Sequence, residues 1–174
     1  MVVCPVSGRP VGRETADASS EVAHQLQATL GESVLFLLNR RRGTNREQGD
    51  VDIVAVAPTG VWVIDPRRYA GKKVRAHDDT FVVDGRRRSE LAASMSCQVA
   101  AVQAAVLRGP VPDAPVSALH CFVDANLPFR GLTVGGVDAT TIRGTRKRLQ
   151  QPGTLDAVYR TGLHAHLGLE FPSA

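Results

Sequence analysis

The feature that most constrains the fold is a pair of apolar, β-branched runs joined by a tight turn. Residues 50–57 alternate in character and are rich in valine, which favours a strand. Pro58, Thr59 and Gly60 are typical turn residues, and residues 61–65 resume the apolar pattern at once. Because runs this close together pair with each other, we expect an antiparallel hairpin in the core.

Acidic side chains mark the ends of this hairpin. Asp50 and Asp52 are two apart on the first strand, so they share one face, and Asp65 ends the second strand. Mg²⁺ prefers oxygen ligands and takes one or two carboxylates, with water and phosphate completing its shell. A cation held in this way can activate water and neutralise charge on a phosphodiester. The alternative is that these acids only end strands and face solvent.

The rest of the chain predicts one α/β domain. Helical spacing and β-branched runs are interleaved, so strands and helices are expected to share a single core. Residues 1–15 are rich in proline and glycine and are expected to form a flexible arm before a domain at 16–174. The expected helices are 17–30, 89–107 and 154–167, the further strands are 33–39, 72–76, 80–84, 116–123 and 137–142, and a basic turn is expected at 146–148.

Composition is that of a globular chain with an uneven charge. The 174 residues are 43% apolar and 22% charged, which excludes wholesale disorder. Residues 37–88 hold 12 basic and 7 acidic side chains, more than the rest of the chain in proportion. This asymmetry favours a polyanionic partner such as nucleic acid, and the alternative is that it serves solubility.

Targeting signals and common metal motifs are not evident. Cys4, Cys97 and Cys121 are an odd, widely spaced set without a C-x-x-C pair, so neither a zinc knuckle nor a redox dithiol is indicated. The first residues lack the apolar core of a signal peptide, and the longest apolar run, 34–38, is too short to span a bilayer. We therefore expect a cytoplasmic protein without a membrane partner; the sequence does not indicate an oligomeric state.

The stretch GDVDIVAVAPTGVWVIDPRRYAG resembles the core of the nuclease-related domain (NERD) family, a branch of the PD-(D/E)XK nuclease superfamily. Asp52 matches the first catalytic acid of that family and Asp65 the second. Tyr69 and Gly71 match its trailing aromatic residue and glycine. Looser similarity extends over about residues 16–172 through Gly85-Arg86-Arg87, Gln98, the run LHCFVDANLPF, and Pro152-Gly153-Thr154.

The resemblance implies a restriction-endonuclease-like α/β core of order αβββαβ, with a mixed central sheet flanked by helices and a small C-terminal α/β tail. It implies hydrolysis of phosphodiester bonds in DNA with Mg²⁺ or Mn²⁺ as cofactor. Asp52, Asp65 and the Pro66 carbonyl would bind the metal ion. Gln98 would reach the site from the long helix, or would serve as a structural amide.

Two departures from the family pattern bear on activity. Arg67 stands where the family has lysine; an arginine stays protonated, so it cannot act as a general base, although it can clamp phosphate and stabilise charge. Ser19 stands where the family's first helix carries glutamate, and Glu21 lies about 200° round the helix from it. Losing acid–base help costs about 10²–10⁴-fold in rate. An active nuclease and an impaired descendant both remain open.

The basic residues around the hairpin are candidates for phosphate contacts that do not depend on base sequence. They serve this purpose if they share a face; otherwise they form a soluble rim. Two further alternatives to an enzyme are a non-catalytic nucleic-acid-binding module on a nuclease scaffold and a protein-interaction domain. The candidates are Arg40, Arg41, Arg42, Arg46, Arg68, Lys72, Lys73, Arg86 and Arg87.

Overall fold

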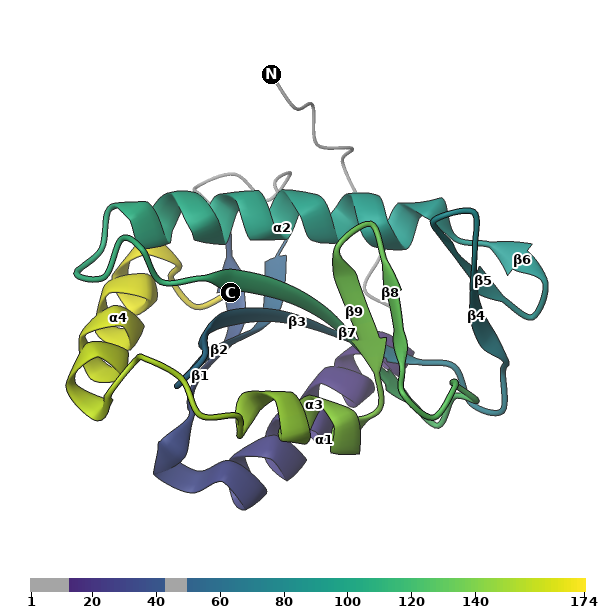
Figure 1. The fold of residues 1–174 in the computed structure, drawn as a ribbon, viewed down its shortest axis with the longest axis horizontal. Helices are drawn as coiled ribbons and strands as arrows, with labels where there is room; N and C mark the ends of the chain where they lie inside the picture. Colours follow the sequence, from purple (N-terminus) through teal and green to yellow (C-terminus); the bar gives the residue numbers. More distant parts are fainter. Residues whose placement is uncertain (1–12, 43–49) are drawn as a thin grey trace.

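The expected hairpin lies in the middle of a six-stranded mixed sheet (Figure 1). The structure is a computed structural model that describes residues 13–42 and 50–174. The first three strands are antiparallel neighbours, and the fourth runs parallel to the third. In sheet order the strands are β1 (Leu35–Arg41), β2 (Asp50–Ala57), β3 (Gly60–Arg68), β7 (Val116–Val123), β9 (Val137–Thr140) and β8 (Leu132–Val134).

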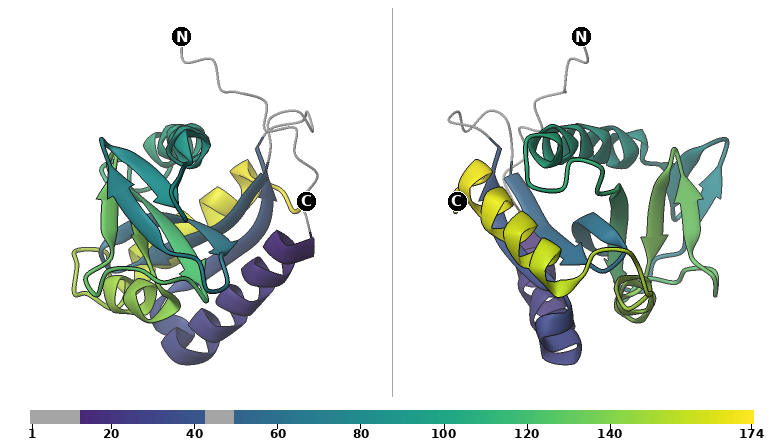
Figure 2. Two further views of the ribbon diagram at one scale, coloured as in Figure 1. Left: turned by 90° about the vertical axis from the view of Figure 1, so that its right-hand side faces the viewer. Right: turned by 60° about the vertical axis from the view of Figure 1, so that its left-hand side comes forward.

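Helices cover both faces of this sheet (Figures 1 and 2). One face packs against α2 (Ser89–Leu107) and α4 (Ala157–Glu170), and the other against α1 (Arg13–Leu30) and α3 (Ile142–Leu149). Successive residues of a strand point to opposite faces, which is why β3 is apolar throughout its first half. Val61 and Val63 join the core beneath α2, whereas Ile64 joins the core beneath α1.

The long helix α2 begins and ends where the sequence predicts. Its apolar stripe, including Leu91, Met95 and Val102, is buried against the sheet. By length and composition alone the helix could also cross a membrane, with a mean hydropathy of 1.3 over its most apolar window. A core helix of a folded domain has the same composition, and the buried stripe matches that role.

A small three-stranded sheet is inserted between β3 and α2. Its strands are β4 (Val74–His77), β5 (Thr80–Val83) and β6 (Arg86–Arg87). Asp78 and Asp79 form the turn between the first two strands with φ of 46° and 51°, as a two-residue hairpin turn requires. Phe81 of β5 is buried against the rings of His120 and Phe122 on β7.

The sequence predictions differ from the structure mainly near the termini. The first helix starts at Arg13, so the last three residues of the expected arm 1–15 belong to α1, while the others lie outside the described residues. The expected basic turn at 146–148 lies inside α3. Thr141 caps that helix by accepting a hydrogen bond from the Gly144 N–H, and basic residues suit its last turn.

The expected C-terminal α/β tail is continuous with the main sheet. The strand β9 runs parallel to β7, and β8 adds to its far side, so both extend the main sheet. The strand β8 was not expected from the sequence. The final helix is shifted to Ala157–Glu170 because Asp156 caps it, accepting from the Tyr159 N–H.

Candidate active site

The two candidate acids lie where the central hairpin opens. The paired positions of β2 and β3 run from Ala57↔Gly60 to Ile53↔Ile64 and end there. Asp52 and Asp65 occupy the next position on each strand, so they face each other just beyond the last paired residues. The sequence could predict this juxtaposition because a tight turn fixes the register of a hairpin.

Asp65 is fully buried and is held by two cationic or potentially cationic side chains. Arg67 lies two residues on along the same strand and donates from Nε (3.0 Å) and Nη2 (2.7 Å) to Asp65 Oδ2. His120 is the register partner of Asp65 on β7, and its Nδ1 lies 3.4 Å from the same oxygen. The other oxygen, Oδ1, is buried without a hydrogen-bond partner among the described residues.

The pKa values of the two acids are shifted in opposite directions. Burial and the neighbouring charge of Asp65 raise the pKa of Asp52 from its ordinary 3.8 to about 7. Burial also acts to raise the pKa of Asp65, but the Arg67 guanidinium and His120 outweigh it and hold that pKa at about 2. At neutral pH the centre is therefore an ionised Asp65 beside an Asp52 that binds a proton readily.

This arrangement makes stability depend on pH. Between pH 4 and pH 7 the folded protein keeps a proton on Asp52 that the unfolded chain has released, so the free energy of unfolding falls as pH rises, by up to about 1.4 kcal/mol per pH unit. Asp65 acts in the opposite sense, since its contribution is lost as pH falls from about 4 towards 2.

We therefore expect the stability advantage of Asp52→Asn over the wild type to be larger at pH 8 than at pH 5, by on the order of 2 to 3 kcal/mol, because the wild type loses stability between these pH values and the variant does not. Urea denaturation at the two pH values measures the difference. Asp50→Asn is the matched control, because Asp50 lies on the same strand but is exposed. A difference between wild type and Asp52→Asn that is the same at both pH values would contradict the coupling of the two acids.

His120 is a site residue that the sequence reasoning missed. Its ring is buried, and Nε2 donates to the carbonyl of Leu91 at the start of α2 (3.2 Å). Both ring nitrogens therefore face oxygen atoms, one from a helix and one from Asp65. The available signal was a histidine inside the apolar run at 116–123, but its partner follows only from the parallel register of β3 and β7.

Of the candidate residues on α1 and α2, only one lies at the same cavity as Asp52. Ser19 is buried and lines the same small cavity, about 190 Å³, as Asp52, so it occupies the position that the resemblance gives to a glutamate. Glu21 forms an ion pair with Arg68 instead. Gln98 is buried on the sheet-facing side of α2 with its Oε1 unpaired, and no hydrogen bond joins it to Asp52 or Asp65.

Pro66 follows Asp65 inside β3 and is buried. Its ring removes one backbone N–H, but its carbonyl remains a possible oxygen ligand. Within the described ranges, no group of three or more His, Cys, Asp or Glu side chains gathers around a common point. A cation at this centre would therefore depend on two carboxylates, one carbonyl and water.

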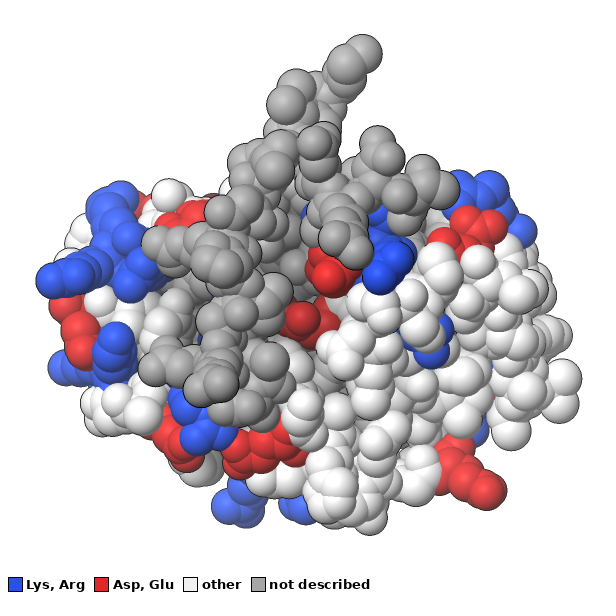
Figure 3. All heavy atoms as spheres, turned by 180° about the vertical axis from the view of Figure 1, so that it is seen from behind, with Lys and Arg blue, Asp and Glu red and all other residues white. Residues whose placement is uncertain are grey.

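Several basic candidates lie beside acidic or polar partners. On the face drawn in Figure 3, Lys and Arg side chains lie in separate groups, with acidic side chains near them. Arg68 pairs with Glu21 and Asp124, Arg87 with Asp78, and Arg40 donates to Ser173 Oγ at 3.0 Å. Several of these charges are therefore already engaged within the fold.

The other basic candidates differ in their surroundings. Lys72 lies over the Tyr69 ring, with Nζ 5.8 Å from its centroid. Burial lowers the pKa of Arg42, and the charge of Asp50 acts in the opposite direction. Arg46 lies outside the described residues. The exposed candidates without an ion pair in the described ranges are Arg41, Lys72, Lys73 and Arg86.

Comparison of the chain with models of protein families, with curated proteins and with solved structures finds no match.

Proposed function

We propose that this protein is a nuclease-like DNA-binding domain in which Asp52 and Asp65 hold a divalent cation, Mg²⁺ or Mn²⁺, and that phosphodiester cleavage is slow because of Arg67. The observation that supports it most is the pair of carboxyl groups at the open end of the hairpin, one of them with a buried, unpaired oxygen. Two carboxylates brought together in this way repel each other unless they share a cation or a proton.

The donor set fits a magnesium-type ion. Such ions take one or two carboxylates and keep several waters, so a third acid is not required. Asp65 Oδ1, the Asp52 carboxylate and the Pro66 carbonyl would hold it, and the ion would supply charge neutralisation and a more acidic bound water. Asp52 would have to release its proton first, which ties metal binding to pH.

The order of elements supports a restriction-endonuclease-like core as part of this proposal. The sequence of α1, β1, β2, β3, α2 and β7 follows the order αβββαβ, with β4–β6 as an insertion. The parallel pairing of β3 with β7 and the helices on both faces agree with that order.

Metal binding has a test that does not depend on catalysis. We expect excess Mg²⁺ to stabilise the wild type at pH 8, by about 2.7 kcal/mol once its concentration is roughly 100 times Kd, and clearly less at pH 5.5, where a proton competes at Asp52. Differential scanning calorimetry measures the shift in Tm. Asp52→Asn and Asp65→Asn should lose it, while the exposed Asp50→Asn should keep it. An equal shift in all four proteins would overturn the metal site.

Cleavage is then tested with linear duplex and single-stranded DNA in Mg²⁺ or Mn²⁺, against Asp65→Ala purified in the same way. Wild-type cleavage no faster than that of Asp65→Ala would defeat the enzymatic part of the proposal.

The second candidate is a DNA-binding module without catalysis. The observation that favours it is the two-pronged contact of Arg67 with Asp65, which already neutralises one of the two candidate ligands. This candidate predicts binding in EDTA with a steep loss of affinity as salt rises, because phosphate contacts release counterions.

A further inference from the structure

A second surface, away from the hairpin's basic loops, gathers several positive side chains at one hollow. The residues between β7 and β8 and the helix α3 enclose a hollow of about 570 Å³. Its lining contains four basic side chains and no acidic one, unlike the neutralised groups described above. The basic residues are Arg130, Arg143, Lys147 and Arg148.

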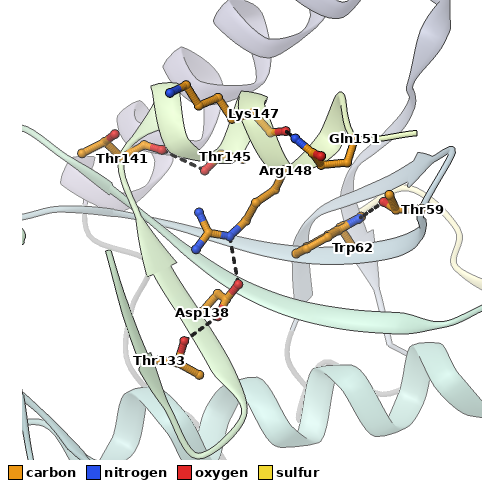
Figure 4. A network of polar contacts seen from close by, with 9 residues as sticks. All are labelled: Thr59, Trp62, Thr133, Asp138, Thr141, Thr145, Lys147, Arg148 and Gln151. Carbon is orange, nitrogen blue, oxygen red and sulfur yellow. Dashed lines mark hydrogen bonds and ion pairs between the residues drawn. The ribbon is translucent and has the colours of Figure 1, made fainter. Parts of the chain in front are cut away.

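Three of the four cations that line this hollow are exposed and can contact a ligand. Arg130, Arg143 and Lys147 are exposed and form no ion pair within the described ranges. Arg148 is held instead by Asp138, which accepts from its Nε at 2.9 Å and also from Thr133. Figure 4 shows Arg148 turned towards Asp138 and the sheet, whereas the side chain of Lys147 extends away from it.

An aromatic side chain stands at the same hollow. Phe129 is 101% exposed, the highest exposure among the large apolar side chains described. A turn presents it outward, since the Gly131 N–H donates to the Pro128 carbonyl at 2.9 Å. Gly131 has φ of 77°, and an added Cβ would lie 2.6 Å from the Ala139 carbonyl, so this turn is closely fitted to β9.

The hollow adjoins a second one on the α1 side of the sheet. It shares Ala125, Thr141 and Arg143 with a second hollow of about 530 Å³ that lies between α1 and α3. That second hollow is also lined by Phe122 and Val123 of β7 and by two acidic side chains, Glu21 and Asp124, both of which pair with Arg68. Arg146 lines it as well, with a buried Nε that has no hydrogen-bond partner in the described ranges.

We infer that the two hollows form a groove for single-stranded DNA, with phosphates on Arg130, Arg143 and Lys147 and a base stacked on Phe129. Cationic side chains that track the backbone and an exposed aromatic ring that takes a base are how proteins bind single strands without reading sequence. A duplex keeps its bases stacked internally, so it could use the cations but not Phe129. The inference rests on the proposed function for DNA as the ligand, and it requires neither a metal ion nor cleavage.

The test is binding of a fluorescent 12-residue oligothymidylate in EDTA, followed by anisotropy at several salt concentrations. We expect Phe129→Ala to weaken binding about tenfold and Phe129→Tyr to restore it, with little change for a duplex of the same length. Arg143→Gln with Lys147→Gln should weaken binding to both ligands and lower the salt slope by about 1.4 for the single strand. Leu169→Ala and Arg108→Gln, which change an exposed apolar residue and a cation at the α4 end, are the matched controls.

Circular dichroism and urea denaturation confirm that each variant folds. The inference is overturned if the wild type does not bind the oligonucleotide at low salt, or if the groove variants bind as tightly as the controls. It is also overturned if Phe129→Ala affects binding to vesicles of anionic lipid but not to the oligonucleotide. Because the assay contains EDTA, failure of the metal proposal would leave its result unchanged.

Discussion

Arg67→Lys is expected to increase metal-dependent DNA cleavage by about 10²-fold or more. Lysine keeps a cation two residues after Asp65, so the charge of the buried acid stays balanced. A divalent cation on the two carboxylates would offset the negative charge that keeps this amine protonated, and an amine, unlike a guanidinium, can then lose its proton near neutral pH and exchange it with the attacking water. Acid–base help of this kind contributes about 10²–10⁴-fold to enzymatic rates. Initial rates on a labelled DNA substrate in Mg²⁺ measure the gain.

The controls separate chemistry from charge. Arg67→Gln removes the cation without adding a base and should show no gain, and Arg67→Lys combined with Asp65→Ala should be inactive. If Arg67→Lys cleaves no faster than Arg67→Gln, the arginine is not what limits the reaction, and the DNA-binding module becomes the better description.

Arg67→Gln is expected to lower the free energy of unfolding by about 3 kcal/mol at pH 7. Its side chain is 30% exposed, but its partner Asp65 is fully buried, so the substitution leaves a buried carboxylate with only His120 beside it. Removing one member of a buried ion pair costs about 3–5 kcal/mol, and the partial exposure of Arg67 places the effect at the low end. Urea denaturation measures it.

A double-mutant cycle shows where that loss comes from. In the Asp65→Asn background the same change at Arg67 should cost no more than about 1 kcal/mol, because the buried charge is gone. Arg86→Gln, at an exposed and unpaired position, should change stability by less than about 0.5 kcal/mol. Additive effects of the changes at Asp65 and Arg67 would show that their contact does not stabilise the fold.

Local sequence patterns predicted the central elements well. The helix at 89–107 and the strands at 50–57 and 116–123 have the bounds that the pattern gave, because each is a regular apolar run between clear turn or proline signals. The facing of Asp52 and Asp65 followed from the same hairpin. The fold is confirmed as a mixed sheet flanked by helices, whereas a restriction-endonuclease-like core stays a proposal.

What local patterns could not predict depends on contacts between distant segments. His120 is brought to Asp65 by parallel pairing of strands that a hairpin insertion and a helix separate. The basic surface was expected because basic residues cluster along the chain. In the fold, Arg68 and Arg87 form ion pairs with acidic side chains from other segments. The sequence predicts a turn at 146–148, where the structure has α3, because this short segment has too few apolar positions to show a helical period.

The pairing of β3 with β7 also affects the order in which the centre forms during folding. Asp65 and Arg67 belong to one strand of a tight hairpin, so their contact needs only local chain closure, which is fast. His120 joins them only after α2 has crossed the sheet and β7 has docked, a long-range step with a larger entropic cost. We therefore expect Arg67 to be paired with Asp65 already when β7 docks and buries that carboxylate.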